Sequence, residues 1–307
     1  LAQSGTTLVA AGYSDPRFIR MAPGQITTLF ITGARTIFPA GMPVQRAAVA
    51  PLPVTLAGFS VLISQQPGNK TESMPILSVQ QVNNCSSRAA SPDCVVTAIA
   101  AQVPSGLVVE NPLASSAVTT VTTATIIEDG EAGKPFNVTL LPQNFHILTT
   151  CDPNMPDPPL ALFPTECANM VTHADGTQVS PQNPARAGEE LVMYAFGLGA
   201  TTPLVPAGSM SPTPAATAQG HFTITSAYGA GPPPTSQSNA FNRPNPLFVG
   251  LTPGQVGLYQ VNFIVEPPGG PTAGCDGPAQ ANLTVTLSSD LSPSTDSARI
   301  CVDTASQ

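Results

Sequence analysis

The residues that could do chemistry in this chain are three histidines and a few groups of carboxylates. His146 and His221 have apolar neighbours in extended segments, so we expect both to be core or edge residues of strands. His173 lies two residues before Asp175 in a glycine-containing turn. A histidine beside a carboxylate can act as a base or bind a metal, but this spacing favours an exposed pair in a turn.

Glycoside hydrolysis requires two carboxylates across a cleft, and three acidic groups are the candidates. They are Glu128, Asp129 and Glu131; Asp152 and Asp157; and Glu189 and Glu190. We expect each group of carboxylates to lie in a turn or loop, exposed to solvent. The segment from 152 to 157 could hold Ca²⁺ through oxygen ligands, but it contains prolines and lacks the EF-hand glycine. The nucleophile pattern Gly-x-Ser-x-Gly is also absent. We therefore predict no catalytic residue, metal site or cofactor, and a protein that is not an enzyme.

Six cysteines lie along the sequence as three neighbouring pairs. The pairs are Cys85 and Cys94, Cys151 and Cys167, and Cys275 and Cys301. Disulfides within these pairs are the economical prediction. Buried free thiols and a metal site are the alternatives, although no Cys-x-x-Cys or nearby histidine completes a tetrahedral site. Persistent disulfides indicate an oxidising compartment.

Composition bears on the partners and the location of the protein. The 307 residues carry a net charge of −8 and contain only ten Lys and Arg, so we expect no nucleic-acid partner. The apolar stretch 47–63 is interrupted by Pro51 and Pro53, so we predict no membrane-spanning helix. The chain begins at Leu1 without Met or an apolar leader, as expected of a protein exported through a cleaved signal peptide. We expect an extracellular or cell-surface location.

An internal repeat organises the chain. Residues 22–30 recur as 186–194, residues 39–43 as 206–212, and residues 98–104 as 261–267. The offsets are 164, 167 and 163 positions. Three collinear matches at nearly one spacing predict two tandem copies of one domain, and the chain length suits two domains. We place the boundary after Asn144, which gives an N-terminal domain 1–144 and a C-terminal domain 145–307.

The repeated domain is predicted to be all-β. Alternation of apolar residues places Tyr259, Val261 and Phe263 on one face of a strand, and Pro and Gly separate many similar short segments. No window shows convincing helical spacing. The strands that we expect include 26–32, 59–63, 95–102, 118–127, 136–140, 191–196, 222–225 and 283–287. This pattern predicts two tandem immunoglobulin-like antiparallel β-sandwiches.

Several motifs resemble a functionally uncharacterised family, the immunoglobulin-like C-terminal domain of secreted acidobacterial proteins. They are residues 174–177, 183–188, 194–199 and 256–262, with 22–24, 51–53 and 101–104 in the first half. The resemblance spans most of residues 13–303 and implies export and a β-sandwich, but no catalytic residue. Physical roles are also expected: positive φ or a bulge at Gly197 and Gly199, and a core position for Tyr259 with its hydroxyl bound to backbone.

The leading functional hypothesis is a non-enzymatic extracellular structural or adhesive protein, a self-associating filament or cell-surface subunit. The alternatives are a carbohydrate- or ligand-binding module, for which a chain with no Trp and four Tyr supplies few aromatic platforms, and a hydrolase with an unrecognised site.

The expected partner is a second copy, whose sheet would receive an N-terminal strand from this chain. The residues expected to pair in this way are Thr6, Thr7, Leu8, Val9 and Ala10. The alternative is that they form the first strand of their own sandwich. Glycosylation sequons begin at Asn69, Asn84, Asn137 and Asn282.

Overall fold

A computed structural model describes most of the chain. The described residues are 7–11, 19–39, 42–83, 85, 92–109, 120–152, 167–229, 245–270, 272, 274–275 and 281–303. Every regular element in them is a β-strand, and nearly all pairs of neighbouring strands are antiparallel. The all-β prediction is therefore confirmed. None of the described residues belongs to a helix of the length and hydropathy needed to cross a membrane.

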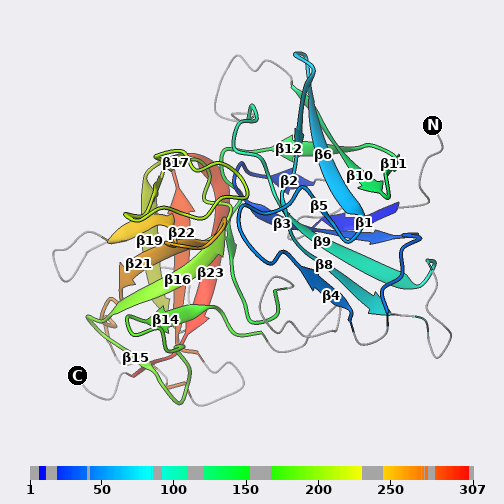
Figure 1. Ribbon diagram of the computed structural model, residues 1–307. Coiled ribbons are helices and arrows are strands. Elements are labelled where there is room, and N and C mark those ends of the chain that lie inside the picture. The colour runs from blue at the N-terminus through cyan, green and yellow to red at the C-terminus, as the bar shows by residue number, and fades with distance from the viewer. Residues whose placement is uncertain are drawn as a thin grey trace.

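The first half of the chain forms two sheets (Figure 1). One has the order β1 (Thr7–Ala11), β3 (Ile26–Thr32), β9 (Val95–Gln102), β8 (Ile76–Asn83) and β4 (Val44–Arg46). The other has the order β2 (Arg20–Met21), β12 (Phe136–Leu140), β10 (Val121–Glu128), β6 (Phe59–Gln66) and β5 (Thr55–Leu56), with β7 (Lys70–Ser73) on β6 and β11 (Glu131–Ala132) on β10. Their facing apolar side chains, such as Leu29, Ile99 and Val61, form one buried cluster.

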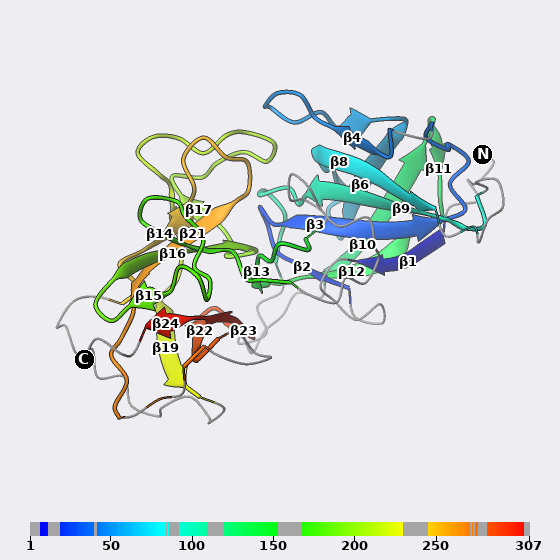
Figure 2. The same cartoon turned by 90° about the horizontal axis from the view of Figure 1, so that it is seen from below.

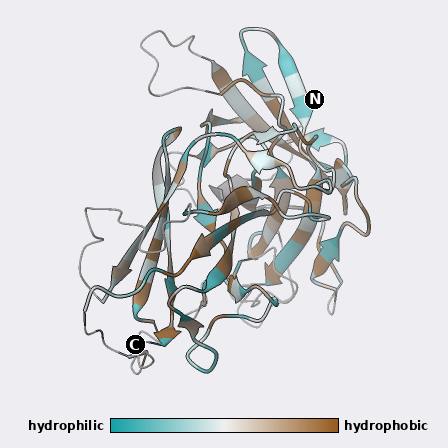
Figure 3. Ribbon diagram, turned by 90° about the vertical axis from the view of Figure 1, so that its left-hand side faces the viewer, coloured by the Kyte–Doolittle hydropathy of each residue, from teal (hydrophilic) through white to brown (hydrophobic). Residues whose placement is uncertain are grey.

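The described residues of the second half form three further sheets. One sheet has the order β13 (His146–Ile147), β16 (Glu190–Phe196), β21 (Tyr259–Ile264), β20 (Phe248–Leu251), β18 (Thr217–Ala218) and β17 (Thr201–Thr202), with β14 (Val171–His173) also on β16. A second has the order β19 (Phe222–Tyr228), β22 (Leu283–Ser289) and β23 (Ser292–Ile300), and β15 (Ala185–Arg186) pairs with β24 (Val302–Asp303). Hydrophobic residues along these strands (Figure 3) form a second buried cluster that includes Met193, Val261 and Val285.

Hydrogen bonds show how the two copies correspond. Gly24 N donates to the Val103 carbonyl at 2.9 Å, and Gly188 N donates to the Val265 carbonyl at 2.8 Å. In register with these bonds, Ile26 lies opposite Gln102 and Glu190 opposite Ile264. The match of 98–104 with 261–267 was therefore wrong by one residue, because Val265 follows Val103 by 162 positions. A slip of one residue would exchange the two faces of the strand.

The first strand of each copy differs. In the first copy, β1 pairs with β3 and has a bulge between Leu8 and Ala10. In the second copy, β13 and β14 together take this place on β16, and the segment between Leu148 and Met170 is inserted at the corresponding point. The second copy therefore carries an insertion where the first has only a bulge.

The position of β1 corrects the expected route of self-association. Thr7 and Leu8 pair with Thr32 and Ile31 of the same chain, at one edge of the first sheet. The N-terminal segment thus forms the first strand of its own sheet, which is the alternative that the sequence left open; Thr6 lies outside the described residues. Strand donation would require β1 to leave this sheet and lose its backbone hydrogen bonds. Self-association through another surface stays a prediction.

Three disulfides join the neighbouring cysteines, in agreement with the sequence prediction. They are Cys85–Cys94, Cys151–Cys167 and Cys275–Cys301, with sequence separations of 9, 16 and 26 residues. The first joins the segment after β8 to the start of β9, the second closes the insertion, and the third reaches the residue between β23 and β24. Each disulfide stays within one half of the chain, so none of them restrains one half against the other.

The two halves, whose strands lie side by side in Figure 2, meet in a third buried apolar cluster. The fully buried members are Ile26 and Ala100 from the first half and Leu148 and Phe196 from the second. The two halves are joined by residues 141–144, where Asn144 N donates to the Gly197 carbonyl at 2.8 Å and Asn144 Nδ2 reaches Gln25 Oε1 at 3.2 Å. The junction is therefore packed and hydrogen-bonded rather than spanned by an open linker.

Candidate functional site

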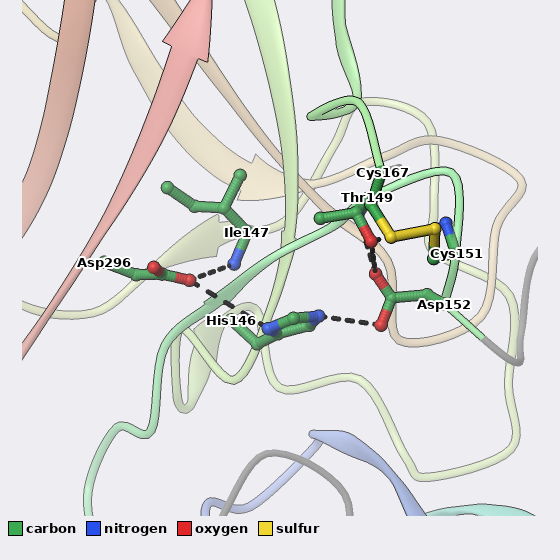
Figure 4. A network of polar contacts seen from close by, with 7 residues as sticks. All are labelled: His146, Ile147, Thr149, Cys151, Asp152, Cys167 and Asp296. Carbon is green, nitrogen blue, oxygen red and sulfur yellow. Dashed lines mark hydrogen bonds and ion pairs between the residues drawn. A yellow bond between two sulfur atoms is a disulfide. The ribbon is translucent and has the colours of Figure 1, made fainter. Parts of the chain in front are cut away.

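The insertion in the second copy brings together a histidine and two aspartates (Figure 4). His146 Nε2 lies 2.7 Å from Asp152 Oδ1, and its Nδ1 lies 4.0 Å from Asp296 Oδ2. His146 comes from the edge strand β13, Asp152 from the loop of the insertion, and Asp296 from β23. The imidazole therefore lies between two carboxylates from segments far apart in the sequence.

The two carboxylates are also bound to backbone. Asp152 Oδ2 accepts hydrogen bonds from Thr149 N at 2.6 Å and Thr149 Oγ1 at 3.0 Å, and Asp152 is only 5% exposed. Asp296 Oδ2 accepts from Ile147 N at 2.6 Å. Cys151, next to Asp152, is held in its disulfide with Cys167 and does not supply a thiol. These contacts therefore connect the start of the insertion to β23, and this is a structural role that requires no substrate.

A second histidine makes a pair different from the one expected. His173 Nδ1 lies 2.5 Å from Glu189 Oε1, and its Nε2 lies 3.2 Å from the Asn183 carbonyl. Asp175 instead accepts hydrogen bonds from Thr177 N and Oγ1, at 2.9 and 2.7 Å, which lower the pKa of Asp175. The prediction of an exposed His173–Asp175 pair is therefore wrong, because β14 and the start of β16 bring Glu189 closer.

The contact with Glu189 changes the pKa of His173. Burial by itself would lower the pKa of the imidazole, but the hydrogen bonds to Glu189 and to the Asn183 carbonyl and the charges of Glu189 and Asp175 outweigh it. The net effect raises the pKa of His173 above 6.5. The doubly protonated ring can donate one hydrogen bond to each of its two oxygen partners, so the folded protein favours the cation.

We expect Glu189→Gln to destabilise the protein more in acid than in alkali. Because the pKa of His173 is raised on folding, its contribution is fully present below pH 6.5 and is lost as the pH rises through the folded pKa. The expected cost is about 1 kcal/mol at about pH 5.5 and less at about pH 8.5. Urea unfolding at both values measures it. The control is Glu131→Gln, whose partner Arg35 keeps its charge throughout this range, so an equal change with pH in both variants would contradict the assignment.

Glu189 also has a counterpart in the first copy. Glu189 Oε2 accepts from Arg186 N at 2.8 Å, and Gln25 Oε1 accepts from Ala22 N at 2.8 Å. In this turn the acceptor of the backbone N–H is a charged carboxylate in the second copy and a neutral amide in the first. In the first copy this amide oxygen, Gln25 Oε1, also accepts a hydrogen bond from Asn144 Nδ2 of the junction.

Other candidate residues are spread over the molecule. Glu128 was expected in solvent but is fully buried, where it accepts from Thr36 N at 2.7 Å. Glu190 accepts from Asn262 Nδ2 at 3.1 Å. His221 is exposed immediately before β19, so the expectation of a strand histidine is wrong there. Asp157 lies outside the described residues, and within them no three His, Cys, Asp or Glu are grouped as metal ligands.

The sequons also differ in their surroundings. Asn282 is buried, its Nδ2 donating to the Val302 carbonyl and its Oδ1 accepting from Val302 N, both at 2.8 Å. A glycan on this amide would break both bonds. Asn69 and Asn137 are exposed, and Asn84 lies outside the described residues.

The junction contains a small cavity that the sequence did not suggest. Its volume is about 10 Å³, enough for one water molecule. Gly24 and Gln102 line it from the first half, and Gly199 and Tyr259 from the second. The Tyr259 hydroxyl donates to the Gly199 carbonyl, as expected, and burial raises the pKa of Tyr259. This cavity is too small for a sugar or a cofactor.

The chain was also compared with known proteins. No protein-family model matches it, and no curated protein matches it.

Proposed function

We propose that the protein is a non-enzymatic, exported structural or adhesive module, built from two tandem immunoglobulin-like β-sandwiches and assembling with copies of itself. The resemblance to the domain family of secreted acidobacterial proteins is part of this proposal. The observation that carries it is the packed junction between the two halves.

The strand order supports an immunoglobulin-like assignment. In the first half, β1, β3, β9 and β8 are neighbours in one sheet, and β12, β10 and β6 in the other. In chain order this is the ABED and GFC arrangement of the immunoglobulin sandwich. The second half has the same pairs, β16 with β21 and β19 with β22. A short parallel pair also occurs in each half, β2 with β12 and β15 with β24.

The junction supports a mechanical role. Leu52 N donates to the Gly208 carbonyl at 2.8 Å, and Gly208 N donates to Gln102 Oε1 at 2.6 Å, so loops of both halves are tied together away from the connecting residues. With Ile26 and Phe196 buried beside them, rotation of one half against the other would expose apolar surface and break hydrogen bonds. A pair of domains held in this way transmits force and keeps a fixed spacing.

Export is supported by the three disulfides, since such bonds persist in oxidising compartments. The insertion and the segment before β24 each contain one. Closing loops of 16 and 26 residues contributes about 3 to 3.5 kcal/mol each in the chain-entropy model. These bonds would stabilise the second half in an oxidising extracellular environment.

The proposal is tested with the full-length oxidised protein. We expect it in the extracellular or cell-surface fraction of its host, and we expect no turnover of glycoside, ester or peptide substrates. Asp152→Asn and Glu189→Gln probe the two histidine pairs, and Asp175→Asn, in an exposed turn, is the matched control. Turnover that either of the first two variants abolishes, and the control keeps, would overturn the non-enzymatic assignment.

A further inference from the structure

Two long segments without charged side chains meet at the junction of the two halves. No Asp, Glu, Lys or Arg occurs between Arg46 and Lys70, or between Glu190 and Arg243. The hydrogen bond from Leu52 N to the Gly208 carbonyl joins a loop of the first segment to a loop of the second, and the two loops lie side by side in Figure 2. Neither segment contributes a formal charge to the surface at the junction.

This surface exposes large apolar side chains. Val49 is 72% exposed and Val54 48% on the first segment; Leu204 is 60% exposed and Met210 55% on the second. We call these four residues the junction ridge. They make up four of the eight large hydrophobic side chains that are exposed among the described residues. Such a concentration of exposed apolar residues is typical of an interaction site.

Two sheets also end beside the ridge. β5 is the last strand of its sheet in the first half, and β17 is the last strand of its sheet in the second. Sheet edges are usually protected from pairing with other chains by lysine or other charges. The residues of these strands are Thr55 and Leu56, and Thr201 and Thr202, so neither edge has this protection.

The repeat itself does not offer a route to assembly. The junction buries Ile26 and Ala100 of the first copy, and the equivalent positions in the second copy are Glu190 and Asn262. A third domain could not pack on that face in the same way without burying a carboxylate. The internal contact therefore ends after two domains, and β1 is already paired within its own sheet.

We propose that the junction ridge is the surface through which two copies of this chain associate; this rests on the self-assembly in the proposed function. Copies with a net charge of −8 repel each other, and the repulsion is weakest where uncharged surfaces face each other. The four ridge residues carry no charge, so burying them against each other is not offset by desolvation of ions. A strongly charged partner would find no ion pair with the four ridge residues.

Sedimentation velocity of the full-length oxidised protein over a range of concentrations tests the assignment. We expect Leu204→Glu and Val49→Glu each to weaken self-association by about tenfold or more, because each places an unpaired carboxylate in the contact. The matched controls are Val108→Glu and Val121→Glu, at positions 57% and 52% exposed. They lie near Gln65 and Gln66, at the end of β6 opposite to the strand pair with β5. All four variants add one negative charge, so the increase in overall electrostatic repulsion between two copies is the same in each.

The outcomes separate the ridge from self-assembly as such. Association weakened by the ridge variants, with the controls within about twofold of the unmodified protein, supports the ridge. Association that the ridge variants leave intact, or that the controls weaken equally, overturns the ridge and keeps self-assembly. A protein that is monomeric at every concentration overturns both the ridge and the self-assembly. Unchanged far-UV circular dichroism shows that each variant is folded.

Discussion

Gly197→Ala is expected to cost about 3 kcal/mol or more of stability, a large effect for a single added methyl group. A Cβ at this position would lie 1.9 Å from the Asn144 carbonyl oxygen, a backbone atom, and Gly197 has a φ of +79°. The same two residues are joined by the hydrogen bond from Asn144 N to the Gly197 carbonyl. The connecting residues and the end of β16 would have to separate, which opens the junction.

The control for this prediction is Gly130→Ala. Gly130 has a φ of +82°, and an added Cβ would have no atom within 4 Å. This variant measures the cost of the backbone conformation alone, about 1 kcal/mol. Urea unfolding of both variants gives the difference that belongs to the junction. Equal losses in the two proteins would mean that the chain relaxes around residue 197 and that the close approach of Asn144 is unimportant.

The second large effect is expected from Ile26→Glu, which gives the first copy the residue found at the equivalent position of the second. Ile26 is 1% exposed in the junction cluster with Leu148 and Phe196, so an unpaired carboxylate there should cost at least about 3 kcal/mol. The loss should be local, because Ile26 belongs to neither of the two larger buried clusters.

Hydrogen exchange followed by mass spectrometry distinguishes a local from a global effect. In Ile26→Glu, exchange should rise around residues 141–148 and 194–199, while β10 and β22 stay protected. The matched variant is Glu190→Ile, which makes the reverse change outside the junction and should leave exchange at 141–148 unaltered. Loss of protection in β10 would show that Ile26 supports the first-half core as well, and that the junction is not a separate unit of stability.

The sequence alone determined the features that depend on residues close together along the chain. Strands such as 26–32 and 95–102 were predicted with the bounds of β3 and β9, because alternation of apolar residues is a property of consecutive positions. The three disulfides followed from short separations along the chain. The contact of Tyr259 with backbone followed from the need of a buried phenol for a hydrogen-bond acceptor.

The tertiary structure decided which distant residues meet. His146 and Asp296 are 150 positions apart and approach each other only because β13 and β23 belong to sheets of one sandwich. Glu189, rather than the nearby Asp175, binds His173, because the pairing of β14 with β16 overrides proximity along the chain. The pairing of β1 and the burial of Glu128 and Asn282 depend on register in the same way. Side-chain periodicity along a strand is local, whereas its partner strand and register are chosen by the packing of the whole sandwich.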